Sequence, residues 1–325
     1  MRRFSSTIAA RAISHCVASA QADSLTLSHS DSLPSAPLEL VRLPPLMERT
    51  TGSPDVTIGL IDGPVVATHS DLPQERVRDI AREGGGVCTR PESAACLHGT
   101  FVAGILCARR GSSAPAICPD CTLLVRPIFR EMTTARAAEL PTATPGELAR
   151  AILDCLEAGA RVLNVSAAIV RPMGRTERDL QDALDQSARR GVIVIAAAGN
   201  QGIIGGTDIT SHPWVIPVVA YDLQGRPMNY TNIGGSIGRR GLGAPGDRIT
   251  SLGATGQPLT LDGTSAAAPF VTGTVALLWS EFRDATAAAV KFAVTRAAIP
   301  RRQSVVPPLL DAGVACQMMH SMARS

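Results

Sequence analysis

Four polar side chains stand where apolar segments of the sequence end or begin. Asp62 follows the apolar run VTIGLI, and Asn200 comes one glycine after the run VIVIAAA. His98 opens the segment HGTFVAGIL and Ser265 opens SAAAPFVTGTVALL, both with the composition of a buried helix. A carboxylate, an imidazole, an alcohol and an amide are the groups that acyl transfer to a serine requires.

These four groups can form a proton relay. A serine hydroxyl is a weak nucleophile at its ordinary pKa and needs a base within hydrogen-bond reach. His98 would take the proton of Ser265 during attack, and Asp62 would hold the imidazole in one tautomer. The Asn200 amide and the Ser265 backbone N–H would donate to the oxyanion of the tetrahedral intermediate. The sequence therefore predicts a catalytic triad with Asn200 as an oxyanion donor.

Each residue also has a purely structural explanation. Asp62, before a glycine-proline pair, can close an Asx turn. His98 and Ser265 can satisfy free backbone groups at a helix start, and Asn200 can occupy a left-handed turn. For any one of them alone the structural explanation is the commoner one. Their occurrence together, in this order along the chain, favours catalysis.

Five sequence blocks carry the resemblance to a known family: DGPVVATHSDL, HGTFVAGI, LNVSAAI, AAAGNQG and GTSAAAPFVTGTVALL. In this order they resemble the motif blocks of subtilisin-like serine proteases, over residues 50–315. DGPV, the phenylalanine after HGT and CPDCTLLVRPIF are most similar to the cyanobactin maturation proteases, which trim ribosomally made precursor peptides. The resemblance implies a serine endopeptidase that removes a leader from a precursor peptide. The alternatives are a broad-specificity degradative subtilase and a non-catalytic peptide-binding module.

The resemblance also implies two substrate-binding segments at strand ends. The first would add an extended peptide to a strand edge, and the second would form a wall of the pocket for the side chain before the cut. These residues are Ser166, Ala167, Ala168, Ala197, Ala198 and Gly199. The family usually has SLGG where this chain has SAAI, so Ala168 places a methyl group where substrate backbone is expected.

One further carboxylate bears on metal binding. Asp71 matches a position that often binds calcium in the family, but the partner loop CARRGSSAPA offers no acid or amide and carries two arginines. Calcium requires several oxygen ligands. We therefore expect no metal and no other cofactor.

The elements that must position these residues alternate between strand and helix patterns. Short β-branched runs lie at 56–61, 122–128, 161–166, 192–198 and 214–220. Continuous apolar runs of this length are typical of strands buried on both faces of a parallel sheet. The sequence predicts a three-layer, subtilisin-like α/β fold with a mostly parallel central sheet and helices on both faces.

Two helices carry clear end signals. TPGELARAILDCLEAG has Thr144 as N-cap, Glu147 to close a capping box and Gly159 as its stop. TERDLQDALDQSARRG has Thr176 as N-cap and Gly191 as its stop.

Length and composition limit the domain organisation. The chain has 325 residues, 45% of them hydrophobic, which suits one sizeable core. Its net charge of +3, without a dense basic cluster, gives no reason to expect nucleic acid as a partner. No apolar run approaches the roughly 18 residues of a membrane span, so no membrane association is expected. We expect a tail or targeting segment at 1–40, the peptidase domain at 41–316 and a C-terminal tail at 317–325. The oligomeric state stays open.

The N-terminal segment and the cysteines bear on the cellular compartment. The segment before Asp23 is basic and acid-free, but Arg11 and His15 interrupt the apolar stretch that a secretory signal needs, so a cytoplasmic location is expected rather than secretion. Eight cysteines are present, with two close pairs that can form disulfides, stay reduced or share a zinc ion. These pairs are Cys88 with Cys96 and Cys118 with Cys121. Two others fall in helical segments and are expected in the core: Cys107 and Cys155.

Overall fold

A parallel sheet forms the centre of the computed structural model, which describes residues 35–81, 87–131, 143–166, 176–296 and 304–324. In this part of the chain seven parallel strands follow the order β2-β3-β1-β4-β5-β6-β7, and β8 pairs with β9 in an antiparallel hairpin. The strands are β1 Thr57–Asp62, β2 Val77–Asp79, β3 Thr122–Pro127, β4 Val162–Val165, β5 Ile193–Ala197, β6 Val215–Tyr221, β7 Leu242–Pro245, β8 Ile249–Ser251 and β9 Leu259–Leu261.

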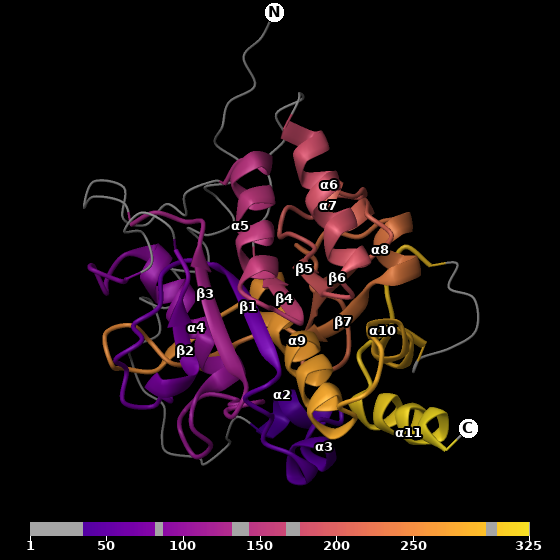
Figure 1. The fold of residues 1–325 in the computed structure, drawn as a ribbon, viewed down its shortest axis with the longest axis horizontal. Helices are drawn as coiled ribbons and strands as arrows, with labels where there is room; N and C mark the ends of the chain where they lie inside the picture. Colours follow the sequence, from indigo (N-terminus) through magenta and orange to yellow (C-terminus); the bar gives the residue numbers. More distant parts are fainter. Residues whose placement is uncertain (1–34, 82–86, 132–142, 167–175, 297–303, 325) are drawn as a thin grey trace, which may run out of the picture.

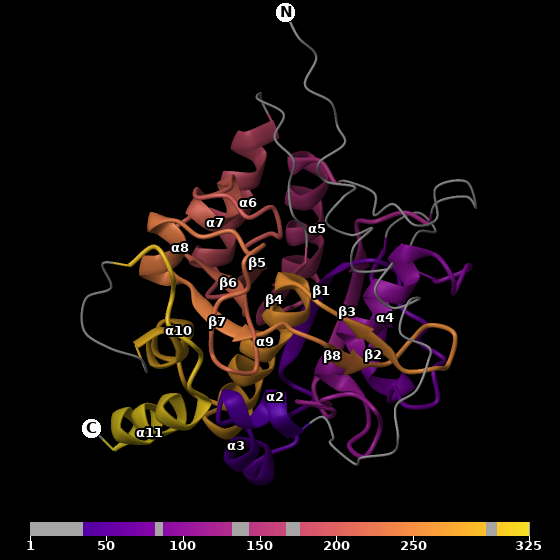
Figure 2. The same ribbon diagram turned by 180° about the vertical axis from the view of Figure 1, so that it is seen from behind.

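Helices cover both faces of this sheet (Figures 1 and 2). Helices α5 and α6 pack side by side on one face, and α4 and α9 pack on the other. The helices are α2 Ser35–Leu40, α3 Pro44–Arg49, α4 Ala94–Cys107, α5 Pro145–Glu157, α6 Thr176–Arg189, α7 Asp208–Ser211, α8 Gly235–Arg240, α9 Thr264–Glu281, α10 Ala287–Arg296 and α11 Ala312–Ala323. The predicted three-layer α/β architecture is confirmed.

The five strands predicted from apolar runs are β1, β3, β4, β5 and β6. Burial on both faces explains their composition: in β1, Ile58 and Leu60 join the core under α4 and α9, while Ile61 joins the core under α5 and α6. The sequence reading missed β2, β7, β8 and β9, each of three or four residues.

Helix α5 ends as its sequence predicts. The Thr144 hydroxyl accepts a hydrogen bond from the Glu147 backbone N–H, and the Glu147 carboxylate accepts one from the Thr144 backbone N–H. Gly159 and Gly191, which follow α5 and α6, have φ of +84° and +68°. These left-handed conformations favour glycine and stop each helix. The cap expected at Thr176 concerns a side chain outside the described residues.

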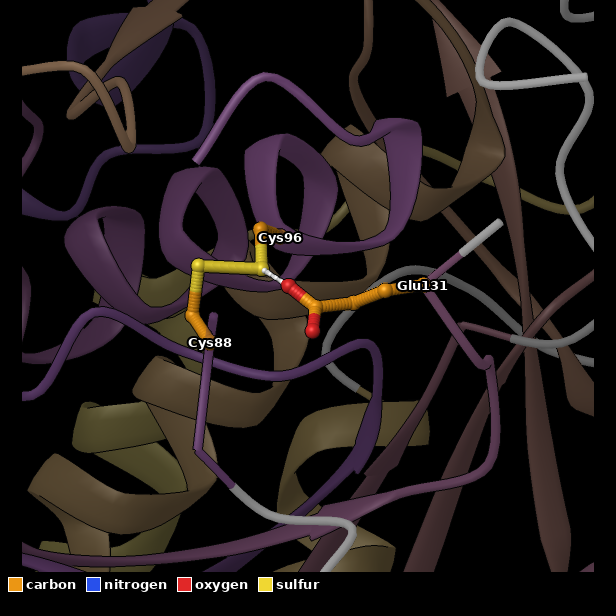
Figure 3. Close-up of side chains that lie close together, drawn as sticks. All are labelled: Cys88, Cys96 and Glu131. Carbon is orange, nitrogen blue, oxygen red and sulfur yellow. Dashed lines mark hydrogen bonds between the residues drawn. A yellow bond between two sulfur atoms is a disulfide. The ribbon is translucent and has the colours of Figure 1, made fainter. Parts of the chain in front are cut away.

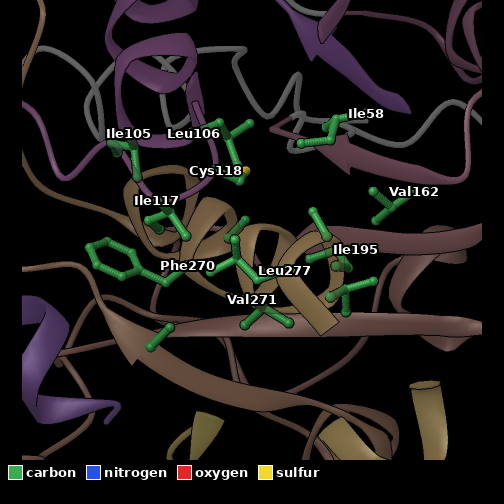
Figure 4. Packing of buried hydrophobic residues seen from close by; sticks show 14 of the residues in the cluster. Ile58, Ile105, Leu106, Ile117, Cys118, Val162, Ile195, Phe270, Val271 and Leu277 are labelled. Atoms are coloured by element: carbon green, nitrogen blue, oxygen red, sulfur yellow. The ribbon is translucent and has the colours of Figure 1, made fainter. Parts of the chain in front are cut away.

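Helix α9 runs through the larger of the two cores. Its side chains Phe270, Val271 and Leu277 are fully buried and pack with residues of α4 and of the central strands (Figure 4). Gly273 allows close approach, because a Cβ there would lie 2.5 Å from Ile117 Cγ2. None of the described helices, α9 included, has the length and apolar character needed to cross a membrane.

The packed part of the chain extends beyond the limits expected at 41 and 316. Helix α2 begins at Ser35 and buries Leu38 in the core. Helix α11 continues to Ala323 and buries Met319. Residues 35–40 and 317–323 therefore contribute apolar packing in segments that the sequence assigned to tails.

Candidate active site

Strand β1 places a carboxylate at the centre of the sheet's carboxyl edge. Asp62 is the last residue of β1 and is fully buried. Its Oδ1 accepts a hydrogen bond from the Gly63 backbone N–H at 2.6 Å. The Asx turn itself does not form, because it needs the N–H two residues on and Pro64 has none. The same carboxylate oxygen also contacts His98.

Helix α4 brings His98 to this carboxylate. The helix begins at Ala94, one turn earlier than expected, because Ser93 caps it by accepting a hydrogen bond from the Cys96 N–H. His98 therefore lies within the helix rather than at its start. Its Nδ1 lies 2.7 Å from Asp62 Oδ1, and the residue is only 9% exposed.

Two glycines permit this close crossing of β1 and α4. A Cβ on Gly63 would lie 2.0 Å from the Ala95 carbonyl oxygen, and one on Gly99 would lie 2.4 Å from the Gly63 carbonyl oxygen. Real Cβ atoms do not approach so closely, so any side chain at either position would push the imidazole and the carboxylate apart.

Helix α9 supplies the hydroxyl. It begins at Thr264, and its N-cap, Gly263, has φ of +130° and provides no side-chain cap. Ser265 therefore does not serve as the helix cap. Its Oγ lies 2.8 Å from His98 Nε2. Asp62, His98 and Ser265 form one continuous line of hydrogen bonds, as the sequence predicted.

The buried carboxylate sets the electrostatics of this line. Burial lowers the pKa of His98, but the charge of Asp62 and its hydrogen bond raise it more, so the pKa lies above its ordinary value. Asp62 Oδ2 is buried without a hydrogen-bond partner in the described part of the chain. The negative charge of Asp62 therefore acts mainly on the His98 imidazole and stabilises the protonated form of that ring.

Asn200 lies beside the N-terminus of α9 and is oriented by Thr264. Asn200 Oδ1 accepts from the Thr264 backbone N–H at 3.0 Å and from its hydroxyl at 2.9 Å. The Thr264 hydroxyl in turn accepts from the Gly199 N–H at 3.1 Å. These bonds fix which end of the amide is oxygen, so Asn200 Nδ2 stays available as a donor. Sequence reasoning missed Thr264, although a hydroxyl next to Ser265 was a usable signal.

The described residues of the expected substrate segments lie at the same edge of the sheet. Ser166 follows β4 and is held by a buried network in which Asn164 donates to its Oγ at 3.1 Å and accepts from Thr272 Oγ1 at 2.8 Å. Ala197 and Ala198, at the end of β5, are 4% and 2% exposed. Gly199 follows with φ of +102°. Two expected contacts lie outside the described residues: Ala167 and Ala168.

The structure decides between the cysteine alternatives. Cys88 and Cys96 form a disulfide. Cys118 and Cys121 are buried free thiols that do not join them. The two pairs therefore do not share a metal site. Cys107 and Cys155 are buried free thiols in the two cores, as predicted.

A parallel α/β sheet with an aspartate–histidine–serine line at its carboxyl edge defines a serine hydrolase type of site. The chain belongs to the subtilase family, the Peptidase S8 family, whose model matches residues 53–314.

Solved structures support the same fold. The chain is 27–28% identical to a mutant of the protease domain of PatA (TM-score 0.74; 84% of this chain and 98% of that chain covered) and to the prenylagaramide maturation protease PagA (TM-score 0.72; 85% and 98%).

Two curated proteins show the range of relatives. Mycosin-1 of Mycobacterium tuberculosis is 28% identical over 295 residues, which are 75% of this chain and 63% of that protein. Subtilisin DY of Bacillus licheniformis is 27% identical over 242 residues, 73% and 81% of the two lengths. The chain thus spans less than two thirds of mycosin-1.

Proposed function

We propose that the protein is a serine endopeptidase in which Asp62, His98 and Ser265 form the catalytic triad. The observation that carries the proposal is the continuous hydrogen-bonded line, 2.7 Å from carboxylate to imidazole and 2.8 Å from imidazole to hydroxyl. Distances of this size allow proton transfer without rearrangement.

The geometry leads to a two-step acyl transfer. Ser265 Oγ attacks the peptide carbonyl carbon and its proton moves to His98 Nε2, while Asp62 holds the opposite ring nitrogen. The oxyanion accepts from Asn200 Nδ2 and from the Ser265 N–H, which is one of the first four of α9 and has no acceptor within the helix. His98 then gives its proton to the leaving amine. Water, deprotonated by the same ring, hydrolyses the acyl-enzyme.

The substrate that we propose is a ribosomally made precursor peptide from which a leader is removed. Its support is similarity: PagA and PatA, whose structures are each matched over 98% of their chains, are a maturation protease and the protease domain of one. Peptide substrates would bind as an extended strand along the segment after β4 and present one side chain towards Ala197–Gly199. No cofactor enters this mechanism.

A fluorophosphonate probe tests the catalytic assignment, because it phosphonylates a serine only when the triad activates it. We expect labelling of the wild type and none of Ser265→Ala. Labelling that persists in Ser265→Ala would show that another serine is the nucleophile. No labelling of the wild type would favour the non-catalytic module.

A peptide panel tests the substrate class. Precursor peptides and casein are digested side by side, and mass spectrometry locates the cuts. We expect turnover of the precursor peptides at one junction and little digestion of casein. Equal turnover of both would instead support a broad degradative subtilase.

A further inference from the structure

A disulfide and a carboxylate meet beside the first turn of α4. Cys88 and Cys96 are bonded, and Glu131, which lies beyond β3, directs its carboxylate at the Cys96 sulfur (Figure 3). Glu131 Oε1 lies 2.6 Å from that sulfur and also accepts the backbone N–H groups of Thr89 and Arg90 at 2.9 and 2.7 Å. Its Oε2 accepts the Thr89 hydroxyl at 2.5 Å. Glu131 therefore fastens the loop after Cys88 to the segment that follows β3.

The chemistry available to this group is that of the disulfide. Two sulfurs and a carboxylate lie within 4.8 Å of one another, as in a site for a thiophilic metal. However, the sulfurs are bonded to each other, and the carboxylate already accepts three donated hydrogen bonds. The group offers no thiolate ligand in this state.

The two sulfurs differ in access. Cys96 is fully buried, and the Glu131 carboxylate covers its sulfur on the side away from Cys88 (Figure 3). Cys88 is only partly buried. An incoming thiolate attacks in line with the S–S bond, so it reaches the Cys88 sulfur and Cys96 becomes the leaving group.

This disulfide is attached to the helix that positions His98. Cys96 lies two residues before His98 on α4. The segment that carries Glu131 is bonded to the other partner, because the Ile128 N–H donates to the Asp62 carbonyl at 2.8 Å. The contacts thus form a closed circuit: Asp62 is bonded to the segment of Glu131, Glu131 contacts Cys96, and Cys96 shares α4 with His98, which contacts Asp62. The disulfide connects the loop at Cys88 to this circuit.

We propose that the Cys88–Cys96 disulfide is a redox site that controls turnover: the oxidised form holds His98 in line with Asp62, and a dithiol reductant releases it. The inference rests on the proposed peptidase function.

The dithiol reductant supplies the electrons and protons for thiol–disulfide exchange at Cys88–Cys96. One thiolate of the dithiol bonds to Cys88 Sγ as the Cys88–Cys96 bond breaks, and Cys96 takes up a proton. The second thiolate attacks the mixed disulfide and releases Cys88 as a thiol. The protein gains two electrons and two protons, and the dithiol becomes a disulfide.

Reduction must move the loop. Two unbonded sulfurs require roughly 1.5 Å more separation than bonded ones. Cys96 has no room to retreat, since Glu131 stands behind it. The Cys88 side therefore moves, and because Thr89 and Arg90 are bonded to Glu131, it displaces the carboxylate that contacts the first turn of α4. Misplacement of a catalytic group by about 1 Å can lower the rate by 10²-fold, so we expect kcat to fall at least about tenfold.

The test compares the full-length protein before and after incubation with dithiothreitol. Turnover of a cleavable peptide and the rate of fluorophosphonate labelling are measured, and alkylation with mass spectrometry reports the state of Cys88 and Cys96. We expect both rates to fall at least about tenfold and to recover after oxidation, with an unchanged circular dichroism spectrum. The Cys316→Ser variant, which removes a free thiol on α11, should respond as the wild type does.

Two variants sharpen the test. Cys88→Ser/Cys96→Ser should have low turnover that dithiothreitol does not change. Glu131→Gln should be reduced roughly tenfold faster, because the leaving Cys96 thiolate no longer faces a carboxylate.

Three results on turnover would overturn the proposal. They are unchanged turnover once Cys88 and Cys96 are alkylated, full turnover of the double serine variant, and equal sensitivity of that variant to dithiothreitol. Labelling of the serine at the same rate in both redox forms would refute the switch but leave the peptidase function standing. Absence of labelling in both forms would refute the peptidase function as well.

Discussion

The Thr264 hydroxyl offers a sharp test of how the oxyanion hole is held. It donates to Asn200 Oδ1 at 2.9 Å and accepts from the Gly199 N–H at 3.1 Å, while being 1% exposed. Thr264→Val keeps the volume and removes both bonds. Asn200 keeps a single anchor, the Thr264 backbone N–H at 3.0 Å. We expect the amide to lose orientation without losing its position.

The size of the effect follows from these bonds. Loss of a whole oxyanion donor lowers kcat by about 10²–10³, or about 2.7–4 kcal/mol. One of two anchors on Asn200 remains, so we expect about half of that free energy. This corresponds to a fall in kcat of roughly 10- to 30-fold, with KM little changed. The unpaired Gly199 N–H should lower the free energy of unfolding by about 1–3 kcal/mol as well.

Steady-state kinetics on a cleavable peptide, with active sites counted by fluorophosphonate, measure this change. Thr264→Ser retains the hydroxyl and should retain most of kcat. In an Asn200→Ala background, Thr264→Val should lower kcat no further, because its effect passes through the amide. An equal loss in both backgrounds, or an equal loss in Thr264→Ser, would refute the reasoning.

Four further outcomes are expected. Because the reaction needs neutral His98 and its pKa is raised, kcat/KM should fall at acidic pH with a midpoint above the ordinary 6.5. Asp62→Asn should move that midpoint to lower pH and reduce kcat by about 10⁴-fold, which a pH–rate profile measures. Gly63→Ala places a Cβ against a backbone carbonyl of α4 and should destabilise the fold by about 1–3 kcal/mol in urea unfolding, whereas Gly235→Ala, with nothing within 4 Å, should be nearly neutral. Burial lowers the pKa of Lys291 from 10.5 to about 8. Between about pH 8 and pH 10.5 the folded state therefore binds fewer protons than the unfolded state. Stability should therefore rise with pH in that window, and Lys291→Met should abolish the rise.

The sheet was predictable because its central strands are buried on both faces. Such strands need continuous β-branched runs, and each run in the sequence corresponds to one strand within about a residue. Short edge elements carry no such pattern: Val77–Asp79 has no buried residue in three, so period and hydropathy contain no signal there.

The helix start predicted at His98 was wrong for a physical reason, since α4 begins at Ala94. His98 precedes Gly99, which is unfavourable inside a helix, so a helix start at that point fitted local propensity. The glycine is there because α4 crosses the end of β1 too closely for a side chain. A tertiary contact thus overrides the local preference, and no local pattern reports it.

The cysteine pairing was undecidable from the sequence because spacing along the chain does not report distance in space. Cys88 and Cys96 are eight positions apart in the sequence, yet their Cα atoms lie 5.6 Å apart, within the range of a disulfide. Disulfides persist in oxidising compartments, whereas the N-terminal sequence suggested the cytoplasm. Under the proposed redox control, a reducing cytoplasm would hold the enzyme in its slow form.

Backbone conformation explains why the oxyanion donor has space at all. Gly199 and Gly263 flank the amide of Asn200 and have φ of +102° and +130°, a region that side chains avoid. A Cβ on Gly263 would lie 2.7 Å from Asn200 Nδ2, the atom that donates to the oxyanion in the proposed mechanism. The nucleophile sits two residues after Gly263, and the amide one residue after Gly199. The same two glycines therefore set the positions of both donors, so a substitution at either should impair transition-state stabilisation even if the triad stays aligned.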